Sequence, residues 1–351
     1  MKKKVLVGMS GGVDSSVTAY LLKEQGYDVI GVTMCLGIAS ADDDKTKCCG
    51  ADAIADAKKV CLALNIPHYV LDFSKEMQKF VIDDFVSEYK KGRTPNPCVQ
   101  CNKYLKFEKL FNYAQVMNCD FLATGHYARI EQEDNEFFLK KPKDSKKDQT
   151  YFLYCIEKEK LANILFPLAD YTKKEVREIA EKAGLLVAKK PQSQDICFIT
   201  DKNYKKFLKQ RLGKIKTGDV VDKEGNVLGK HTGIFNYTIG QRRGIGIAHT
   251  EPFYVIKLDV ANNKVVVGNK KDLESNMLIA DKVNLFVDKL PNKCSAKIRY
   301  LKQETPCSCE FIDKTKYKVV FDKPQEAITQ GQYVVFYAED KVLGGGVIEI
   351  Q

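Results

Sequence analysis

The 351-residue sequence has no apolar run that approaches the roughly 20 residues needed to cross a lipid bilayer. It also lacks the pattern of a secretory signal. The apolar segment after Lys2–Lys4 stops at Gly8, short of the ~7–15 residues required, and no small-residue cleavage site follows. No internal repeat or low-complexity tract is present. These absences argue against membrane, secreted and repeat proteins, and we expect a cytoplasmic protein.

Two common nucleotide-binding patterns are also missing. One glycine-rich segment exists, but its spacing does not fit Gly-x-Gly-x-x-Gly, and it lacks the Gly-Lys-Ser/Thr of a P-loop. A hydride-transfer enzyme and an ordinary P-loop NTPase are therefore disfavoured. The segment itself reads Ser10-Gly11-Gly12-Val13-Asp14-Ser15, and it follows the buried run Val5–Val7 and precedes a helical pattern.

This loop suits a phosphate or pyrophosphate, because backbone N–H groups at a helix start attract anions. We expect Gly11 and Gly12 to take positive φ and to let the backbone approach a ligand closely. Ser10 and Ser15 can donate hydroxyl hydrogen bonds, and Asp14 can hold the Mg²⁺ that bridges phosphate oxygens. The pattern is that of an ATP-pyrophosphatase loop, which predicts an enzyme that cleaves ATP to AMP and pyrophosphate to activate another molecule.

Composition describes an ordinary globular protein of two or three domains, with 44% hydrophobic and 29% charged residues. The formal net charge is +10, from 56 Lys and Arg against 46 Asp and Glu. Seven basic residues and one acidic residue lie between Asp201 and Lys216. Such a local surplus favours a polyanionic partner such as RNA.

Apolar runs alternate with helical patterns from residue 4 to about 130, which predicts an α/β domain with a parallel sheet covered by helices on both faces. Ligands of such sheets lie at the carboxyl ends of the strands, where the loop, Met34 and Gly125 fall. After about Gly218, short alternating segments predict a small mixed domain and then a C-terminal antiparallel β-barrel. We expect domains at 1–200, 201–275 and 276–351.

Individual elements can be predicted from periodicity, capping and turn residues. The predicted helices are 15–25, 51–64, 75–89, 103–117 and a helical region within 161–183. The predicted strands are 5–7, 28–34, 68–72 and 121–124, followed in the β region by 220–221, 253–258, 264–267, 297–300, 318–321, 333–337 and 342–350.

The twelve cysteines are expected to be mostly reduced. Cys98 and Cys101 form a Cys-x-x-Cys in a proline-rich turn before a helix, where a helix N-terminus would lower the pKa of a thiol. Cys197 lies in a distant polar loop. From spacing alone, redox chemistry, metal binding and chance all remain open. The other assignments are that Cys61, Cys119 and Cys155 are core residues, that Cys294, Cys307 and Cys309 have no partners, that Cys48 and Cys49 have no direct role, and that His126 faces the site.

Taken together, these residues resemble the bacterial tRNA-specific 2-thiouridylase family, with Cys-x-x-Cys in place of the usual Asp-x-x-Cys. The resemblance covers essentially the whole chain. It runs through Gly8–Ser16, Gly92–Pro97, Cys101–Lys103, Ala123–Tyr127, Lys147–Gln149, Tyr151–Leu153, Ser193–Ile199, Gly233, Tyr237–Gly244 and Arg299–Tyr300.

The resemblance implies that sulfur replaces the C2 oxygen of the wobble uridine, position 34, in certain tRNAs. ATP would adenylate that oxygen and release pyrophosphate, with Mg²⁺ and loop N–H groups stabilising the charge. In the family, the residue matching Cys197 carries a persulfide from a cysteine desulfurase or relay protein. The residue matching Cys101 frees the sulfur and leaves a Cys101–Cys197 disulfide. The implied ATP contacts are Gly8, Met9, Ser10, Gly11, Gly12, Val13, Asp14, Ser15, Met34 and Gly125.

The same resemblance implies a set of tRNA contacts, with the target base flipped out of the anticodon stack. They are Asn96, Pro97, Cys98, His126, Lys147, Asp148, Gln149, Arg299, Tyr300 and Gln332. Many relatives have Asp where this chain has Cys98. Either Cys98 is a spectator, or Cys98, Cys101 and Cys197 hold a [4Fe–4S] cluster with one open iron.

Two other function classes compete. A pyrophosphatase-loop enzyme that joins carbon to nitrogen needs no paired cysteines, and a non-catalytic RNA-binding protein needs no intact ATP loop. The paired cysteines argue against the carbon–nitrogen ligase, and the intact loop argues against the non-catalytic RNA-binding protein. Nothing in the sequence signals an oligomer, and we expect a monomer.

Overall fold

The computed structural model describes residues 2–39, 48–191, 196–201, 203–213, 216–247 and 251–349, without the side chains of residues 39, 48 and 49. Predictions for Ser193–Asp195, for Lys202 and Lys214 and for the side chains of Cys48 and Cys49 lie outside these residues. The chain forms two compact units. Unit 1 comprises residues 1–81, 98–201 and 340–342, and unit 2 comprises residues 82–97, 202–339 and 343–351.

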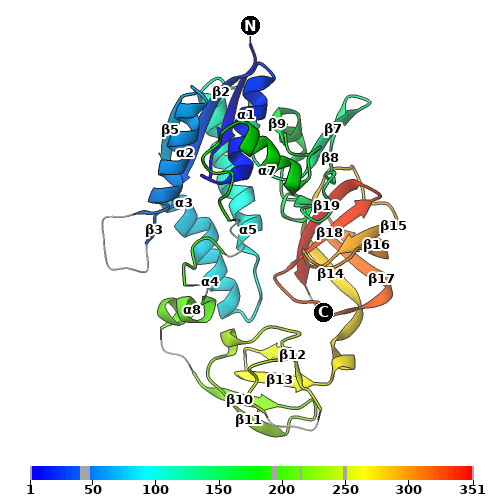
Figure 1. Cartoon of the computed structure of the whole chain (residues 1–351). Helices are drawn as coiled ribbons and strands as arrows, with labels where there is room; N and C mark the ends of the chain where they lie inside the picture. Colours follow the sequence, from blue (N-terminus) through cyan, green and yellow to red (C-terminus); the bar gives the residue numbers. More distant parts are fainter. Residues whose placement is uncertain are drawn as a thin grey trace. The chain divides into compact units, whose positions relative to one another are not determined.

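Unit 1 is built on a five-stranded sheet in the order β5-β2-β1-β6-β9, with all neighbours parallel (Figure 1). Its strands are β1 (Lys4–Gly8), β2 (Asp28–Cys35), β5 (His68–Asp72), β6 (Phe121–Ala123) and β9 (Ile164–Leu165). The chain runs outward from β1 to β2 and β5, and then continues on the other side of β1 at β6. Loops after β1 and β6 therefore meet where the strand order reverses, the usual ligand position in such sheets.

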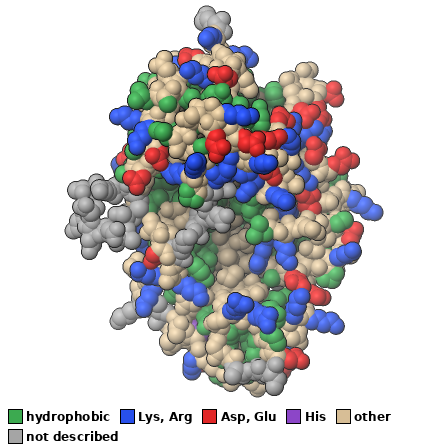
Figure 2. All heavy atoms as spheres, viewed as in Figure 1, with side chains coloured by type: hydrophobic (Ala, Val, Ile, Leu, Met, Phe, Trp, Pro, Cys, Tyr) green, Lys and Arg blue, Asp and Glu red, His purple; other side chains and the backbone are tan. Residues whose placement is uncertain are grey.

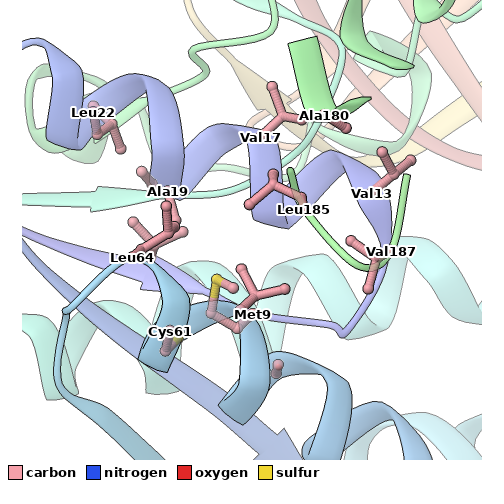
Figure 3. Close-up of a cluster of buried hydrophobic side chains, with 14 of the residues drawn as sticks. Met9, Val13, Val17, Ala19, Leu22, Cys61, Leu64, Ala180, Leu185 and Val187 are labelled. Atoms are coloured by element: carbon pink, nitrogen blue, oxygen red, sulfur yellow. The ribbon is translucent and has the colours of Figure 1, made fainter. Parts of the chain in front are cut away.

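Three helices of unit 1 enclose a hydrophobic core on this sheet: α1 (Val13–Glu24), α2 (Ala51–Ala63) and α7 (Lys173–Lys182). Figure 3 shows Val13 and Val17 of α1 near Ala180 of α7, and Met9 beside Cys61 of α2. Met9 and Val13 are both buried, so the loop between them is anchored in the core at each end. A rigid core at both ends fixes the loop backbone in one conformation.

Two longer helical segments contain π-helical stretches. The first runs through α3 (Ser74–Glu76), η1 (Met77–Ile82) and α4 (Asp83–Lys90), and the second through α5 (Pro97–Gln100), η2 (Cys101–Leu110) and α6 (Phe111–Val116). We have no physical account of why the π geometry extends over ten residues in η2. Unit 1 also contains a hairpin of β7 (Arg129–Glu133) and β8 (Glu136–Lys140), and the short elements β3 (Ile38–Ala39), β4 (Cys48–Cys49), η3 (Thr150–Phe152) and η4 (Lys158–Asn163).

Unit 2 contains a basic helix, a small sheet and a barrel. The helix is α8 (Tyr204–Leu212), and the sheet has the order β11-β10-β13-β12. Its strands are β10 (Gly218–Val221), β11 (Val227–His231), β12 (Tyr254–Asp259) and β13 (Lys264–Gly268), with η5 (Ile234–Asn236) between. The β10–β13 pair is parallel and the other two pairs are antiparallel, so this sheet is mixed.

The barrel of unit 2 is closed and antiparallel. Its strands follow the order β14-β17-β16-β15-β18-β19, and β14 pairs with β19 to complete the ring. Alternate residues of β17, namely Tyr317, Val319 and Phe321, are buried inside, as the period of two predicts. The strands are β14 (Glu274–Leu285), β15 (Lys293–Lys297), β16 (Thr305–Asp313), β17 (Lys316–Glu326), β18 (Tyr333–Ala338) and β19 (Lys341–Glu349), preceded by η6 (Lys270–Leu273).

The predicted architecture is confirmed: a parallel α/β sheet first, and a β-barrel last. One element prediction is wrong. Residues 297–300 were expected to be a strand, but β15 ends at Lys297. The helix predicted within 161–183 is present as α7, and the short strand β9 precedes it. Within the described residues, no helix combines the length and the apolar character that crossing a bilayer requires.

Candidate active site

The glycine loop connects β1 to α1 at the carboxyl edge of the sheet. Gly11 has φ of +68°, and a Cβ there would lie 2.2 Å from the backbone oxygen of Ala53. Gly12 is extended, with φ of −103°, so the expectation of positive φ holds for Gly11 and is wrong for Gly12. The Ser10 N–H donates to Ser15 Oγ (3.1 Å), and Ser15 Oγ donates to Gly12 O (3.2 Å), which closes the loop around its own hydroxyl.

Asp14 follows the loop in the first turn of α1. Its Oδ1 accepts hydrogen bonds from Lys173 Nζ (2.5 Å) and Tyr127 Oη (2.9 Å). Burial lowers the pKa of Lys173, an effect that the Asp14 carboxylate opposes. Burial, and then the charge of Asp14, raise the pKa of Tyr127, which therefore stays a neutral donor. A positive ammonium group thus lies next to the glycine loop, at the first turn of α1.

Sequence reasoning missed Lys173, although a signal for it was available. Thr172 caps α7, its Oγ1 accepting from the Glu175 N–H while the Glu175 side chain accepts from the Thr172 N–H. Thr-x-x-Glu is a capping box, and it places the helix start at Lys173. A second missed cation is Lys190, whose Nζ donates to Gly11 O (3.0 Å) and to Asp56 of α2 (2.7 Å).

The loop after β6 lies directly against the glycine loop. A Cβ on Gly125 would be 2.8 Å from Asp14 C and from Ser15 N, so only glycine allows this approach. Met34 lies at the carboxyl end of β2, the strand adjacent to β1, and is half-buried. The predicted nucleotide residues Gly8–Ser15, Met34 and Gly125 therefore come together at one edge of the sheet.

His126 is 8% exposed and packs against Phe107 and Phe166. Lys106 Nζ lies 3.3 Å from His126 Nε2, and since an ammonium can only donate, Nε2 accepts. Nδ1 then carries the proton and donates to Thr124 Oγ1 (2.7 Å). Burial, and then the charge of Lys106, hold the pKa of His126 well below its usual value. His126 is thus a buried neutral acceptor that positions Lys106, not the site-facing group we expected.

The thiols of Cys98, Cys101 and Cys197 lie near enough to one another for a charge on one to shift the pKa of another. Burial raises the pKa of Cys101, and Lys106 opposes this. The pKa of Cys98 is raised by burial and then by the charge of Cys101. Burial, and then the charges of Cys101 and Cys98, raise the pKa of Cys197 to about 12. The expectation that the helix start lowers the pKa of Cys98 and Cys101 is therefore wrong, because desolvation by burial is the largest effect on both thiols.

Cys98 and Cys197 nevertheless keep exposed surface, so reagents can reach them. Lys106 acts on all three thiols and was missed from the sequence. Lys106 also contacts His126, which follows Gly125, so the residue whose charge acts on the thiols is connected to the loop that packs against the glycine loop.

Several predicted tRNA residues support the fold around the site. In unit 1, the Tyr127 N–H donates to Gln149 Oε1 (2.8 Å), and the Gln149 N–H donates to Tyr127 O (3.0 Å). Asp148 is buried and accepts from the Thr150 N–H and hydroxyl. Lys147 is half-buried in the same segment. The segment therefore fixes the tyrosine that contacts Asp14.

Within unit 2, the Gly92–Pro97 segment is held by a turn of the barrel. Gln332 Nε2 donates to Thr94 O (2.8 Å), and the Thr94 N–H donates to Gln330 O (2.9 Å). Arg93 forms ion pairs with Glu88 and Glu349. Asn96 and Pro97 end this segment.

Arg299 has a comparable supporting position in unit 2. It donates to Thr329 Oγ1 (2.7 Å) and to the carbonyls of Ile239 and Ala327, and Tyr300 follows it in a half-buried turn. The hydrogen bonds of Gln332 and Arg299 therefore connect separate loops of unit 2.

Of the remaining cysteine predictions, some are confirmed and one is wrong. Cys61 and Cys155 are buried, as expected, and burial raises their pKa to about 11 and about 12. Cys119 is half-buried. The expectation that Cys294, Cys307 and Cys309 lack partners is wrong, because the barrel brings their sulfurs together.

The glycine loop, its strand position and the nearby thiols define a nucleotide-binding α/β enzyme with sulfur chemistry. Residues 3–201 match the model of the tRNA methyl transferase HUP domain, 205–269 the tRNA methyl transferase PRC-barrel domain, and 275–348 the aminomethyltransferase beta-barrel domain.

Curated relatives match almost the full chain. The tRNA-specific 2-thiouridylase MnmA 1 of Syntrophus aciditrophicus is 52% identical over 99% of this chain and 93% of its own length. MnmA of Clostridioides difficile is 48% identical, and that of Acetivibrio thermocellus 49%, each over 99% of both chains. The chain belongs to the tRNA-specific 2-thiouridylase family. Among solved structures, a 4-thiouridine synthetase–RNA complex with bound ATP is 16% identical over 60% of this chain and 50% of that chain, with a TM-score of 0.37.

Proposed function

We propose that this enzyme replaces the C2 oxygen of wobble uridine 34 in tRNA by sulfur, with ATP as the activating substrate and Cys101 and Cys197 as the sulfur-handling residues. The observation that carries the proposal is that Gly125 packs against the glycine loop, that the next residue, His126, contacts Lys106, and that the charge of Lys106 acts on the thiols. A carbon–nitrogen ligase would have no use for three thiols at this position.

The first step is adenylation. The C2 oxygen of the uridine attacks the α-phosphorus of ATP, the bond to the β-phosphate breaks, and pyrophosphate leaves. Loop N–H groups and Lys173 neutralise the charge that develops on the phosphates. Asp14 would hold a Mg²⁺ ion, which would supply further charge stabilisation when bound.

The second step moves sulfur. The terminal sulfur of a Cys197 persulfide attacks C2, AMP leaves, and the base is joined to Cys197 through a disulfide. The Cys101 thiolate then attacks Cys197 Sγ, which releases 2-thiouridine and leaves a Cys101–Cys197 disulfide. An external dithiol reduces this disulfide, and a cysteine desulfurase or relay protein supplies the next persulfide. Lys106 favours the thiolate that each attack requires.

The three thiols also fit an alternative carrier. Among the described residues, Cys98, Cys101 and Cys197 do not lie with all their sulfurs within 4.8 Å of one another, the spacing that a single ion needs. A [4Fe–4S] cluster binds each thiolate to a different iron and therefore accepts wider spacing. These residues would hold three irons, and the open fourth iron would supply a site for sulfide.

We further propose that the protein works in the cytoplasm as a monomer that binds one tRNA. The predicted domains 1–200, 201–275 and 276–351 would divide the nucleotide site from the tRNA-binding parts. Asn96, Pro97 and Cys98 would contact the target base, and Lys147, Arg299 and Tyr300 would contribute tRNA contacts beside their supporting positions.

The test of function is mass spectrometry of tRNA nucleosides from a strain lacking this protein. We expect loss of 2-thiouridine derivatives, restored by the wild-type gene and not by Cys101→Ser or Cys197→Ser. Unchanged 2-thiouridine in a strain without a paralogue would refute the assignment.

Anaerobic purification with iron and sulfide analysis distinguishes the Cys197 persulfide from the [4Fe–4S] cluster as the sulfur carrier. A persulfide route predicts no bound iron and continued sulfur transfer in Cys98→Ala, which loses only the base contact of that side chain. A cluster predicts about four irons per chain, lost together with activity in Cys98→Ala, and Cys119→Ala serves as the control for a cysteine outside the proposed cluster.

A further inference from the structure

Three cysteines of the barrel converge although they are separate in sequence. Cys294 lies on β15, and Cys307 and Cys309 lie on β16. Cys294 is directly opposite Cys307 in the strand register, and Cys309 is two residues further along, so its side chain points to the same face. Cys307 and Cys309 are buried in the barrel core, and Cys294 is half-buried.

The distances between the sulfurs fit a shared metal ion. Cys294 Sγ is 3.7 Å from Cys307 Sγ and 3.5 Å from Cys309 Sγ, and all three sulfurs lie within 4.8 Å of one another. A disulfide would need about 2.05 Å, and none of the three is in one. Thiolates around Zn²⁺ at about 2.3 Å with tetrahedral angles are separated by about 3.8 Å.

The donor set also selects the kind of ion. Three sulfurs without a carboxylate suit a thiophilic ion and not Mg²⁺ or Ca²⁺. The surrounding side chains, among them Leu290, Ala296 and Phe336, are apolar.

We propose that Cys294, Cys307 and Cys309 form a Zn²⁺ site, with water from the half-buried Cys294 edge as the fourth ligand. The thiols release their protons to solvent as the ion binds, and no electron is transferred. The ion would fasten β15 to β16 inside the barrel. Because binding free energy adds to folding free energy, the site would stabilise the barrel.

The test uses the full-length chain carrying Cys98→Ser, Cys101→Ser and Cys197→Ser, so that the proposed sulfur-handling thiols cannot bind the probe. Titration with Co²⁺ alone is expected to give one equivalent of binding with thiolate-to-metal charge-transfer absorption, displaced by Zn²⁺. Adding Cys294→Ser should weaken binding by at least about 10-fold, while adding Cys119→Ser should not, since both positions are half-buried.

A second readout guards against misfolding of the variant. Zn²⁺ should raise the melting temperature of the Cys119→Ser control and leave that of Cys294→Ser unchanged, with circular dichroism confirming that both fold. The proposal fails if no stoichiometric binding occurs, if Cys294→Ser binds as well as the control, or if peptide mapping finds a Cys294–Cys307 or Cys294–Cys309 disulfide. None of these outcomes depends on whether the enzyme thiolates tRNA.

Discussion

Lys106 is the residue that connects the nucleotide edge of unit 1 to its thiols. It contacts neutral His126, and its charge opposes the desolvation of Cys98, Cys101 and Cys197. In a desolvated position, one charge can decide whether a thiol reacts at neutral pH, since an opposite charge nearby shifts a pKa by about 1–3 units.

Replacing Lys106 by Met should therefore slow alkylation of Cys101 at pH 7.5 by about 10-fold or more, because the thiolate loses its nearby cation. The rate is measured by mass spectrometry after iodoacetamide pulses. Lys109→Met is the matched control, because Lys109 lies on the same helix but pairs with Glu76. Equal rates in the two variants would show that Lys106 does not act on the thiol.

In the same alkylation assay, the rate at Cys197 should keep increasing to a pH above that at which an ordinary thiol is fully ionised. Its pKa is raised to about 12, so the reactive thiolate is the minor form at neutral pH, and its fraction rises about tenfold per pH unit. Alkylation of folded protein should keep rising through pH 10, while the urea-unfolded chain levels off near pH 9. A plateau near pH 9 in the folded protein would contradict this.

At the scale of elements, the loop between β1 and α1 depends on one of its two glycines. Gly11→Ala puts a Cβ against the backbone of α2 at positive φ, and should lower the free energy of unfolding by about 2 kcal/mol or more. The Cβ that Gly12→Ala adds lies 3.4 Å from Ser10 Oγ, and the backbone there is extended. This substitution should lower the free energy of unfolding by about 1 kcal/mol or less. Urea denaturation of both variants measures the difference, and similar losses would contradict the assigned geometry.

Sequence patterns predicted the elements wherever the local signal agreed with the tertiary structure. His68–Asp72 was predicted to the residue, and the glycine loop was found from its spacing after a buried strand. Lys173 could have been found from the Thr172–Glu175 capping box. The strand β9 could not, because two residues show no period.

Long-range features escaped the sequence for a different reason. The raised pKa of Cys101 depends on burial by residues far away in the chain, and the local pattern shows only the helix start. The meeting of Cys294 with Cys309 depends on strand register across a barrel, which turn lengths alone do not set. Arg299 and Gln332 look like exposed contacts in sequence, and only the fold reveals the carbonyls that they bind.

At the scale of the whole molecule, the charge of +10 predicts binding to tRNA that weakens with salt. Lys and Arg side chains occur over much of the face shown in Figure 2. The helix α8 (Tyr204–Leu212) contributes Lys205, Lys206, Lys209 and Arg211 and has no acidic residue. Bases near acidic partners, such as Lys230 beside Asp219, have less net charge to offer a phosphate.

Replacing the four bases of α8 by Gln should therefore reduce the slope of log Kd against log salt by up to about 3, since each phosphate contact contributes about 0.7–0.9. A charge-matched control replaces Lys223, Lys230, Lys270 and Lys318, each paired with a carboxylate, and should change the slope by less than about 1. Fluorescence anisotropy with labelled tRNA at several salt concentrations measures both slopes. If the two variants lose equal slope, total charge and not the position of α8 governs binding.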